Sequence, residues 1–317
     1  MKSIKENEKK YKKLSCPNCS SEDIIKRGFR KTENRGKIQR YYCKDCSQRF
    51  IIDDGFFRMR NHPKKITCAI DLFCRGVSTR KVQEHFKAFY PHNSSHKSVY
   101  KWVVKYSDMI SNFTDKLKIN SGKEIQVDEM EYHRRTNPTK KGVSKEWFID
   151  SVDCKTRYMV GSKYFKSRGQ KEIREVMNKV KYKTEGYVTT ITTDGYTAYE
   201  NVVKKTFGWS NKEQKYLIRH NKVVASKGEG FNIMIERLHN SIRERTKTFR
   251  GFHGSVESAE AIMKGYEIYY NFIRKYQAIK KCPYELAIPE LILSSGNKWL
   301  GVDSYFKVKS FQKSNLQ

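Results

Sequence analysis

The segment EIQVDEMEYH (residues 124–133) decides the fold, because it has the pattern of a β-strand whose apolar run is interrupted by Asp128. Four similar runs follow it, at KEWFIDSVDC (145–154), RYMVGSKYF (157–165), YVTTITTD (187–194) and KYLIRH (215–220). Helical patterns occupy GQKEIREVMNKVK (169–181), the region around TAYENVVKKTF (197–207) and Asn232 to about Lys247. Three strands in hairpin order, followed by alternating helices and strands, predict a mixed α/β sheet with helices on its faces.

Three acidic residues stand where carboxylates can gather beside this sheet. Asp128 lies within the first strand, and Asp194 ends the fourth strand at a carboxyl end, where α/β sheets usually bind their ligands. Glu236 falls in the last helix. There it shares one face with polar and basic residues that recur at helical spacing, namely Asn232, Asn240, Arg243 and Lys247. We predict that the three acids are catalytic and that the other four residues contact DNA.

Three converging carboxylates suit phosphodiester chemistry, which needs alignment and charge neutralisation rather than a protein nucleophile. Two Mg(II) or Mn(II) ions held by hard oxygen ligands supply both. Without cations the carboxylates repel one another, so we expect a metal-free site that is poorly ordered or shifted in pKa. Asp150, Asp153 and Glu129 are rival candidates, although Glu129 is expected to point to the strand face opposite Asp128.

The charge of the chain predicts a polyanionic partner. Lys and Arg total 65 against 34 Asp and Glu, a formal net charge of +31. Nucleic acid is the leading partner for such a charge. No apolar run approaches the roughly 20 residues of a spanning helix, so we expect no membrane partner and a cytoplasmic, nucleoid-associated protein.

Four of the eight cysteines form two pairs, Cys16-x2-Cys19 and Cys43-x2-Cys46, separated by a predicted hairpin. This spacing predicts a structural Zn(II) ion with four sulfur ligands, whereas a redox dithiol would need only one pair. The metal would fold a module too small to hold itself together. Basic residues interleaved with aromatic ones cover the hairpin, a pattern suited to phosphate contacts, with an unliganded basic face as the alternative.

Three short amphipathic segments follow between Pro63 and about Ser107. Gly76 ends the first, Ser78 caps the second, and Ser94 or Ser95 caps the third. This layout predicts a helix-turn-helix whose last helix enters the major groove. The residues at its start that would meet base edges are Ser95, His96, Lys97 and Tyr100. The four that would face the helix's own core are Val99, Trp102, Val103 and Tyr106.

The blocks QVDEMEY (126–132), TTDGYTAY (192–199) and IERLHNSIRERTKTFRGFH (235–253) resemble the catalytic blocks of the DDE transposases of prokaryotic insertion sequences. The likeness is greatest to the insertion-sequence-six type and its relatives with a zinc ribbon. The resemblance implies an RNase H-like fold in which Asp128, Asp194 and Glu236 ligate the catalytic metals. It also implies that Arg243 contacts DNA near the cleavage site. More residues separate Asp194 from Glu236 than is usual in the family, so we place an insertion near FGWSNKEQK (207–215).

We therefore predict four parts. These are a zinc ribbon (1–58), a helix-turn-helix DNA-binding domain (59–118), an RNase H-like DDE catalytic domain with a five-stranded sheet (119–295) and a basic C-terminal tail (296–317). The predicted function is binding of element ends and metal-dependent cleavage and strand transfer. The partners are double-stranded DNA, at terminal inverted repeats and at the target, and further copies of the chain in a homodimer or higher oligomer. Two alternatives stay open, a DNA-binding regulator derived from an inactive transposase and an RNase H-type nuclease without strand transfer.

Overall fold

The computed structural model describes residues 14–33, 36–52, 56, 59–90, 94–135, 143–224, 232–249, 251–293 and 296–302. The chain divides into two compact units, with the boundary after Lys65. From residue 303 onward, the predicted basic tail lies outside the described residues. Among the residues described, none of the helices combines the length and the apolar character needed to cross a bilayer.

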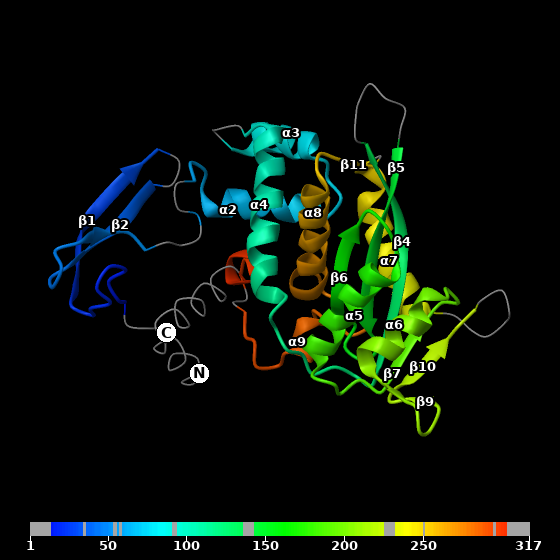
Figure 1. Cartoon of the computed structure of the whole chain (residues 1–317). Helices are drawn as coiled ribbons and strands as arrows, with labels where there is room; N and C mark the ends of the chain where they lie inside the picture. Colours follow the sequence, from blue (N-terminus) through cyan, green and yellow to red (C-terminus); the bar gives the residue numbers. More distant parts are fainter. Residues whose placement is uncertain are drawn as a thin grey trace. The chain divides into compact units, whose positions relative to one another are not determined.

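The first unit is built on a small antiparallel sheet (Figure 1). Its strands are β1 (Ile24–Thr32), β2 (Gly36–Cys43) and β3 (Arg49–Phe50), in the order β1-β2-β3. β1 and β2 pair as the predicted hairpin, with Ile24 opposite Cys43. One cysteine pair precedes β1 and the other begins at the last residue of β2, so the register of the hairpin brings the two pairs to the same end of the sheet.

The second unit begins with three helices, α2 (Pro63–Cys74), α3 (Thr79–Phe89) and α4 (His96–Thr114), as the sequence predicts. Gly76 turns the chain after α2 with a φ of 92°, in the left-handed region that favours glycine. The hydroxyl of Ser78 accepts a hydrogen bond from the backbone N–H of Lys81 and caps α3. The hydroxyl of Ser95 caps α4 in the same way, by accepting from the backbone N–H of Ser98.

A mixed sheet forms the centre of the second unit (Figure 1). Its strands are β4 (Glu124–Arg135), β5 (Val143–Asp153), β6 (Met159–Phe165), β7 (Thr190–Thr193) and β10 (Arg219–Lys222). The order is β10-β7-β4-β5-β6. β5 is antiparallel to both of its neighbours, β4 and β6, and β7 and β10 continue the sheet in parallel from β4. This is the RNase H-like arrangement implied by the resemblance. The short β11 (Phe252–His253) also pairs with the far end of β4.

The predicted strand KYLIRH is divided in the structure. β9 (Lys215–Tyr216) pairs with β8 (Trp209–Ser210) as a separate hairpin, and the sheet strand β10 starts only at Arg219. The β8–β9 hairpin occupies the segment in which the sequence analysis placed an insertion.

Helices cover both faces of the sheet, and side-chain contacts assign each helix to a face. Ser162 of β6 donates to Glu267 of α8 (Val256–Ile268), and Asp150, its partner on β5, contacts α7 (Ile233–Thr246). The adjacent β6 residue Lys163 instead contacts Glu175 of α5 (Gln170–Thr184), which packs against α6 (Ala198–Phe207). Since neighbouring strand residues point to opposite faces, α7 and α8 lie on one face and α5 and α6 on the other. The remaining helical elements are η3 (Lys247–Phe249), η4 (Tyr269–Ile273) and α9 (Tyr284–Ala287).

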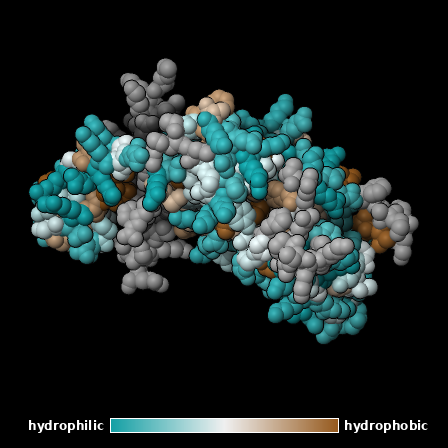
Figure 2. All heavy atoms as spheres, turned by 90° about the horizontal axis from the view of Figure 1, so that it is seen from above, coloured by the Kyte–Doolittle hydropathy of each residue, from teal (hydrophilic) through white to brown (hydrophobic). Residues whose placement is uncertain are grey.

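The core between these layers is apolar, and the surface is not. Val127, Phe148, Ile173 and Val202 are each fully buried, so both faces of the sheet are sealed by aliphatic and aromatic packing. Hydrophilic side chains cover most of the face shown in Figure 2. That surface is consistent with a chain of high positive charge and a polyanionic partner.

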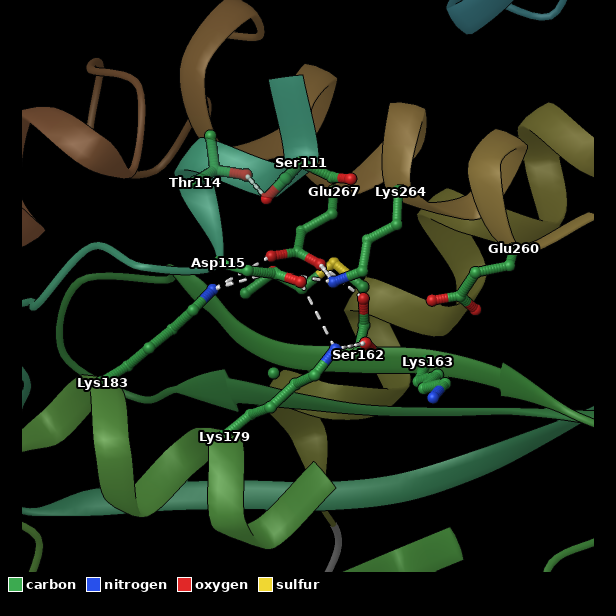
Figure 3. A network of polar contacts seen from close by, with 12 residues as sticks. Ser111, Thr114, Asp115, Ser162, Lys163, Lys179, Lys183, Glu260, Lys264 and Glu267 are labelled. Atoms are coloured by element: carbon green, nitrogen blue, oxygen red, sulfur yellow. Dashed lines mark hydrogen bonds and ion pairs between the residues drawn. The ribbon is translucent and has the colours of Figure 1, made fainter. Parts of the chain in front are cut away.

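A buried cluster of charges joins α4 to the central sheet at the β6 edge (Figure 3). Asp115, at the end of α4, forms ion pairs with three lysines. Its carboxylate oxygens lie 3.0 Å from Nζ of Lys264 on α8, 3.4 Å from Nζ of Lys179 on α5 and 3.5 Å from Nζ of Lys183 on α5. Lys264 also lies 2.6 Å from Glu267 of the same helix. Although burial opposes its charge, the three lysines hold the pKa of Asp115 well below its usual value. Charges taken out of water need such close partners, so the end of α4 is fixed to both α5 and α8.

Candidate active site

Asp128 and Asp194 lie level with each other where β7 ends. β4 and β7 pair in parallel with Gln126 opposite Thr192, so two further residues along each chain bring these two acids side by side. Oxygens of Asp128, Asp194 and Glu129 all lie within 4.8 Å of one another. The backbone N–H of Tyr196 donates to Asp194 Oδ1 at 2.9 Å and fixes that side chain. The donor set is three carboxylates at close range, which fits hard divalent cations such as Mg(II) or Mn(II).

The electrostatics of Asp128 match a site built for cations. Burial raises the pKa of Asp128 to about 7. His239 opposes this shift, whereas the charges of Glu129 and Asp194 add to it. The backbone N–H of Glu129 donates to Asp128 Oδ1 at 2.8 Å. A shifted pKa is thus found at Asp128, with burial as its main cause and the neighbouring carboxylates as a smaller one.

Glu129 belongs to the carboxylate cluster, although sequence reasoning did not place it there. Its side chain leaves the sheet towards α6, where the Tyr199 hydroxyl donates to Oε2 at 2.6 Å. Asp128 faces His239 of α7 on the other side, so the predicted opposite orientation of the two neighbours is correct. The carboxylates still converge, because both acids sit where β7 has ended and Asp194 lies beside them.

Helix α7 is tied to β4 and carries Glu236 beside the site. Gln126 Oε1 accepts hydrogen bonds from the backbone N–H groups of Met234 at 3.0 Å and Ile235 at 3.1 Å. One turn after Glu236, His239 Nδ1 lies 3.6 Å from Asp128 Oδ2. Glu236 itself is exposed and is not part of the cluster of oxygens within 4.8 Å. The structure thus brings Asp128 and Asp194 together and leaves Glu236 on the adjacent helix.

The two remaining rival acids have other partners. Asp150 is fully buried and lies 2.7 Å from His239 Nε2. Burial lowers the pKa of His239, but the charge and hydrogen bond of Asp150, together with Asp128, outweigh burial and raise it. Asp153 closes the β5–β6 turn by accepting from the Thr156 hydroxyl at 2.5 Å and from the Gly122 N–H at 3.0 Å. Both acids therefore stabilise the framework around the site.

Residues 145–276 match a family model described as a DDE domain. The chain carries the DDE domain of insertion-sequence transposases. The matched region contains Asp194 and Glu236 and begins after Asp128. No curated protein matches the chain.

The residues of α7 that are predicted to contact DNA are mostly exposed. Glu236, Asn240, Arg243 and Lys247 are exposed along α7 and its continuation, as the helical spacing predicts. Asn232 is instead buried at the N-cap position of α7, so it does not share this exposed surface. Burial at the start of the helix follows from the contact of Gln126 with the first turn.

The four paired cysteines converge on one point. All four Sγ atoms lie within 4.8 Å of one another, with Cys16 at 3.5 Å from Cys46 and Cys19 at 3.5 Å from Cys43. Sulfurs about 2.3 Å from a tetrahedral metal are roughly 3.8 Å apart. Each Cys-x-x-Cys turn ends in a serine with positive φ, Ser20 at 59° and Ser47 at 58°. Two equivalent turns thus form a four-sulfur site that fits a single ion.

The residues predicted to read bases cluster at the start of α4. Ser95 and Lys97 are exposed, and His96 and Tyr100 are half-buried. Gln83 of α3 accepts a hydrogen bond from the backbone N–H of His96 at 2.8 Å and joins the two helices. The four residues predicted to face the core, Val99, Trp102, Val103 and Tyr106, are all buried. The start of α4 is therefore presented to solvent while its body is packed.

Proposed function

We propose that this transposase binds the ends of its insertion element and catalyses metal-dependent cleavage and strand transfer of DNA. The observation that carries the proposal is the β4–β7 register, which sets Asp128 beside Asp194 at the carboxyl end of a buried parallel pair. Two acids that share a site at close range, one with a pKa raised to about 7, are typical of a cation site.

Asp128, Asp194 and Glu236 would hold two Mg(II) or Mn(II) ions. When bound, such ions lower the pKa of the attacking hydroxyl and stabilise the departing oxygen of an in-line displacement. The protein's own contribution is alignment. The N–H groups of Glu129 and Tyr196 fix Asp128 and Asp194, and Gln126 fixes the helix that carries Glu236. Side-chain rotation at the exposed Glu236 would complete the site.

Separate parts of the chain would position the DNA. The four-cysteine site would hold Zn(II) and support the basic hairpin of β1 and β2 against phosphates. Ser95, His96, Lys97 and Tyr100 would meet base edges in the terminal inverted repeat, and Asn240, Arg243 and Lys247 would contact DNA near the cleaved bond. Since two ends take part in one transposition, a homodimer or higher oligomer would act on the DNA.

The direct test uses purified protein, Mg(II) or Mn(II), and DNA bearing the inverted repeats that flank the gene, with a target plasmid. We expect cleaved and joined products from the natural chain and none from Asp128→Ala, Asp194→Ala or Glu236→Ala. Retention of full activity by one variant would remove that residue from the site. Cleavage without joined molecules would indicate a nuclease, and repeat binding without cleavage would indicate a regulator.

A further inference from the structure

Arg168 packs against two aromatic rings beside the carboxylate cluster. Its guanidinium lies 4.2 Å from the centroid of the Trp147 ring and 4.7 Å from that of Tyr196. Trp147 belongs to β5, and Tyr196 follows Asp194 by two residues. The Tyr196 hydroxyl also donates to the backbone oxygen of Arg168 at 3.4 Å. The stacking therefore fixes the plane of the guanidinium next to the site.

Glu129 is fully engaged by this arrangement. Arg168 Nη1 donates to Glu129 Oε1 at 2.8 Å, and the Tyr199 hydroxyl donates to Oε2 at 2.6 Å. The Glu129 side chain is only 3% exposed. A carboxylate with both oxygens bonded and a cationic partner at contact distance is a weak competitor for a metal ion. Its geometry suits the task of orienting Arg168.

The guanidinium of Arg168 has further N–H groups that can donate to a ligand. Its side chain is 42% exposed, and Glu129 is the only acceptor of its guanidinium within the described ranges. Because the guanidinium is planar, the donors that remain lie in the plane of the group. In-plane guanidinium donors are the ones that bind phosphate oxygens in pairs.

We propose that Arg168 binds a backbone phosphate of the DNA strand at the active site, and that Glu129, Tyr199, Trp147 and Tyr196 position it for that contact. Glu129 is then a positioning residue rather than a third metal carboxylate. This inference rests on the proposed function, since it needs DNA beside Asp128 and Asp194. It deepens that function, because the side chains on the α6 side of the site would bind the DNA substrate and not a metal ion.

Binding without metal tests the phosphate contact. We would measure the affinity of a short DNA duplex of arbitrary sequence in EDTA over a range of salt concentrations. Arg168→Gln should weaken binding about tenfold and reduce the slope of log K against log salt by about 0.9, the value for one lost phosphate contact. The charge-matched control Lys212→Gln, at an exposed position of the β8–β9 turn, should change neither quantity. Unchanged affinity and slope in a folded Arg168→Gln protein would overturn the proposal.

The conservative variant separates geometry from charge. Arg168→Lys keeps the positive charge but loses the planar fork, so it should keep the salt slope and lower the single-turnover cleavage rate at saturating DNA. A cleavage rate equal to that of the natural chain would contradict a geometric role. Because folding of Arg168→Gln could be compromised, Arg168→Lys also serves as the second variant, and both are checked by thermal unfolding.

Metal affinity tests the role of Glu129. Titration calorimetry with Mn(II) should give the same affinity for Glu129→Gln as for the natural chain, while Asp194→Asn should lose binding. An equal loss in Glu129→Gln would make Glu129 a metal ligand and overturn its positioning role. If the natural chain neither cleaves nor joins DNA, the proposed function fails, but binding in EDTA still decides whether Arg168 contacts phosphate.

Discussion

His239 Nε2 lies 2.7 Å from Asp150 Oδ1, in a pair that is almost completely removed from solvent. The other ring nitrogen of His239 lies 3.6 Å from Asp128 Oδ2. One imidazole thus connects α7 to two neighbouring strands, one turn after Glu236. The His239–Asp150 pair therefore holds α7, the helix that carries Glu236, against β5.

Replacing His239 should therefore affect both stability and activity. His239→Ala leaves Asp150 buried without a partner, which we expect to lower the free energy of unfolding by about 3 kcal/mol. Urea unfolding of the variant measures this loss. Arg237→Ala, at an exposed position of the same helix, is the matched control and should remain within about 0.5 kcal/mol of the natural chain.

A second substitution distinguishes an unpaired charge from simple loss of packing. Asp150→Asn in the His239→Ala background removes the charge and should recover part of the lost stability. If the double variant is as unstable as the sum of the two single variants, the pair is not coupled and does not hold α7 in place.

The pH dependence of stability should report on Asp128. Its pKa is raised from the ordinary value of 3.8 to about 7 in the fold. The folded state therefore binds the proton more tightly than the unfolded state, and this contribution is present below pH 3.8 and lost as pH rises to about 7. In EDTA, Asp128→Asn should exceed the natural chain in stability above pH 7, by on the order of 2 kcal/mol.

Cations should reverse this difference. Mn(II) should stabilise the natural chain at pH 8 and leave Asp128→Asn almost unchanged, because a ligand that binds only the folded state adds to its stability. If stability depends on pH in the same way for both proteins in EDTA, the pKa of Asp128 is not raised by the fold.

The sequence predicts the local elements well, and the reason is visible in particular residues. Ser78 and Ser95 each cap the helix that they were predicted to cap, because a hydroxyl before an amphipathic run satisfies the first free N–H groups wherever it occurs. The strand–strand–helix placement of Asp128, Asp194 and Glu236 also follows from local patterns. The convergence of the first two acids depends on the β4–β7 register, which local patterns do not specify.

Tertiary contacts account for what the sequence did not predict. The alternation of side chains correctly sends Glu129 to the face opposite Asp128, but only the end of β7 allows both carboxylates to meet Asp194. Lys264 and Glu267 likewise resemble a solvated helix pair in sequence. In the fold both are buried, because α4 and α5 close over them and supply Asp115 and Lys183.

The buried charge cluster of Figure 3 should be costly to break. Lys264→Met removes the cation closest to Glu267 and Asp115, and we expect a loss of about 3 kcal/mol in the free energy of unfolding. Lys171→Met, at an exposed position of α5, is the control and should have little effect. A Lys264→Met protein as stable as the control would mean that water already solvates the cluster.

The four-cysteine site should bind one Zn(II) per chain, and this zinc should stabilise the first unit but not the second. Because a module of this size has a small core, loss of the metal should unfold it without unfolding the second unit. Metal analysis should find one zinc in the natural chain and less in Cys43→Ser, whereas Cys154→Ala, outside the four-sulfur site, should retain it. Limited proteolysis locates the effect, since the Cys43→Ser chain should be cut before residue 65 while the DDE unit stays intact. Full zinc content in Cys43→Ser, or equal protease resistance of both variants, would show that these sulfurs do not hold the first unit together.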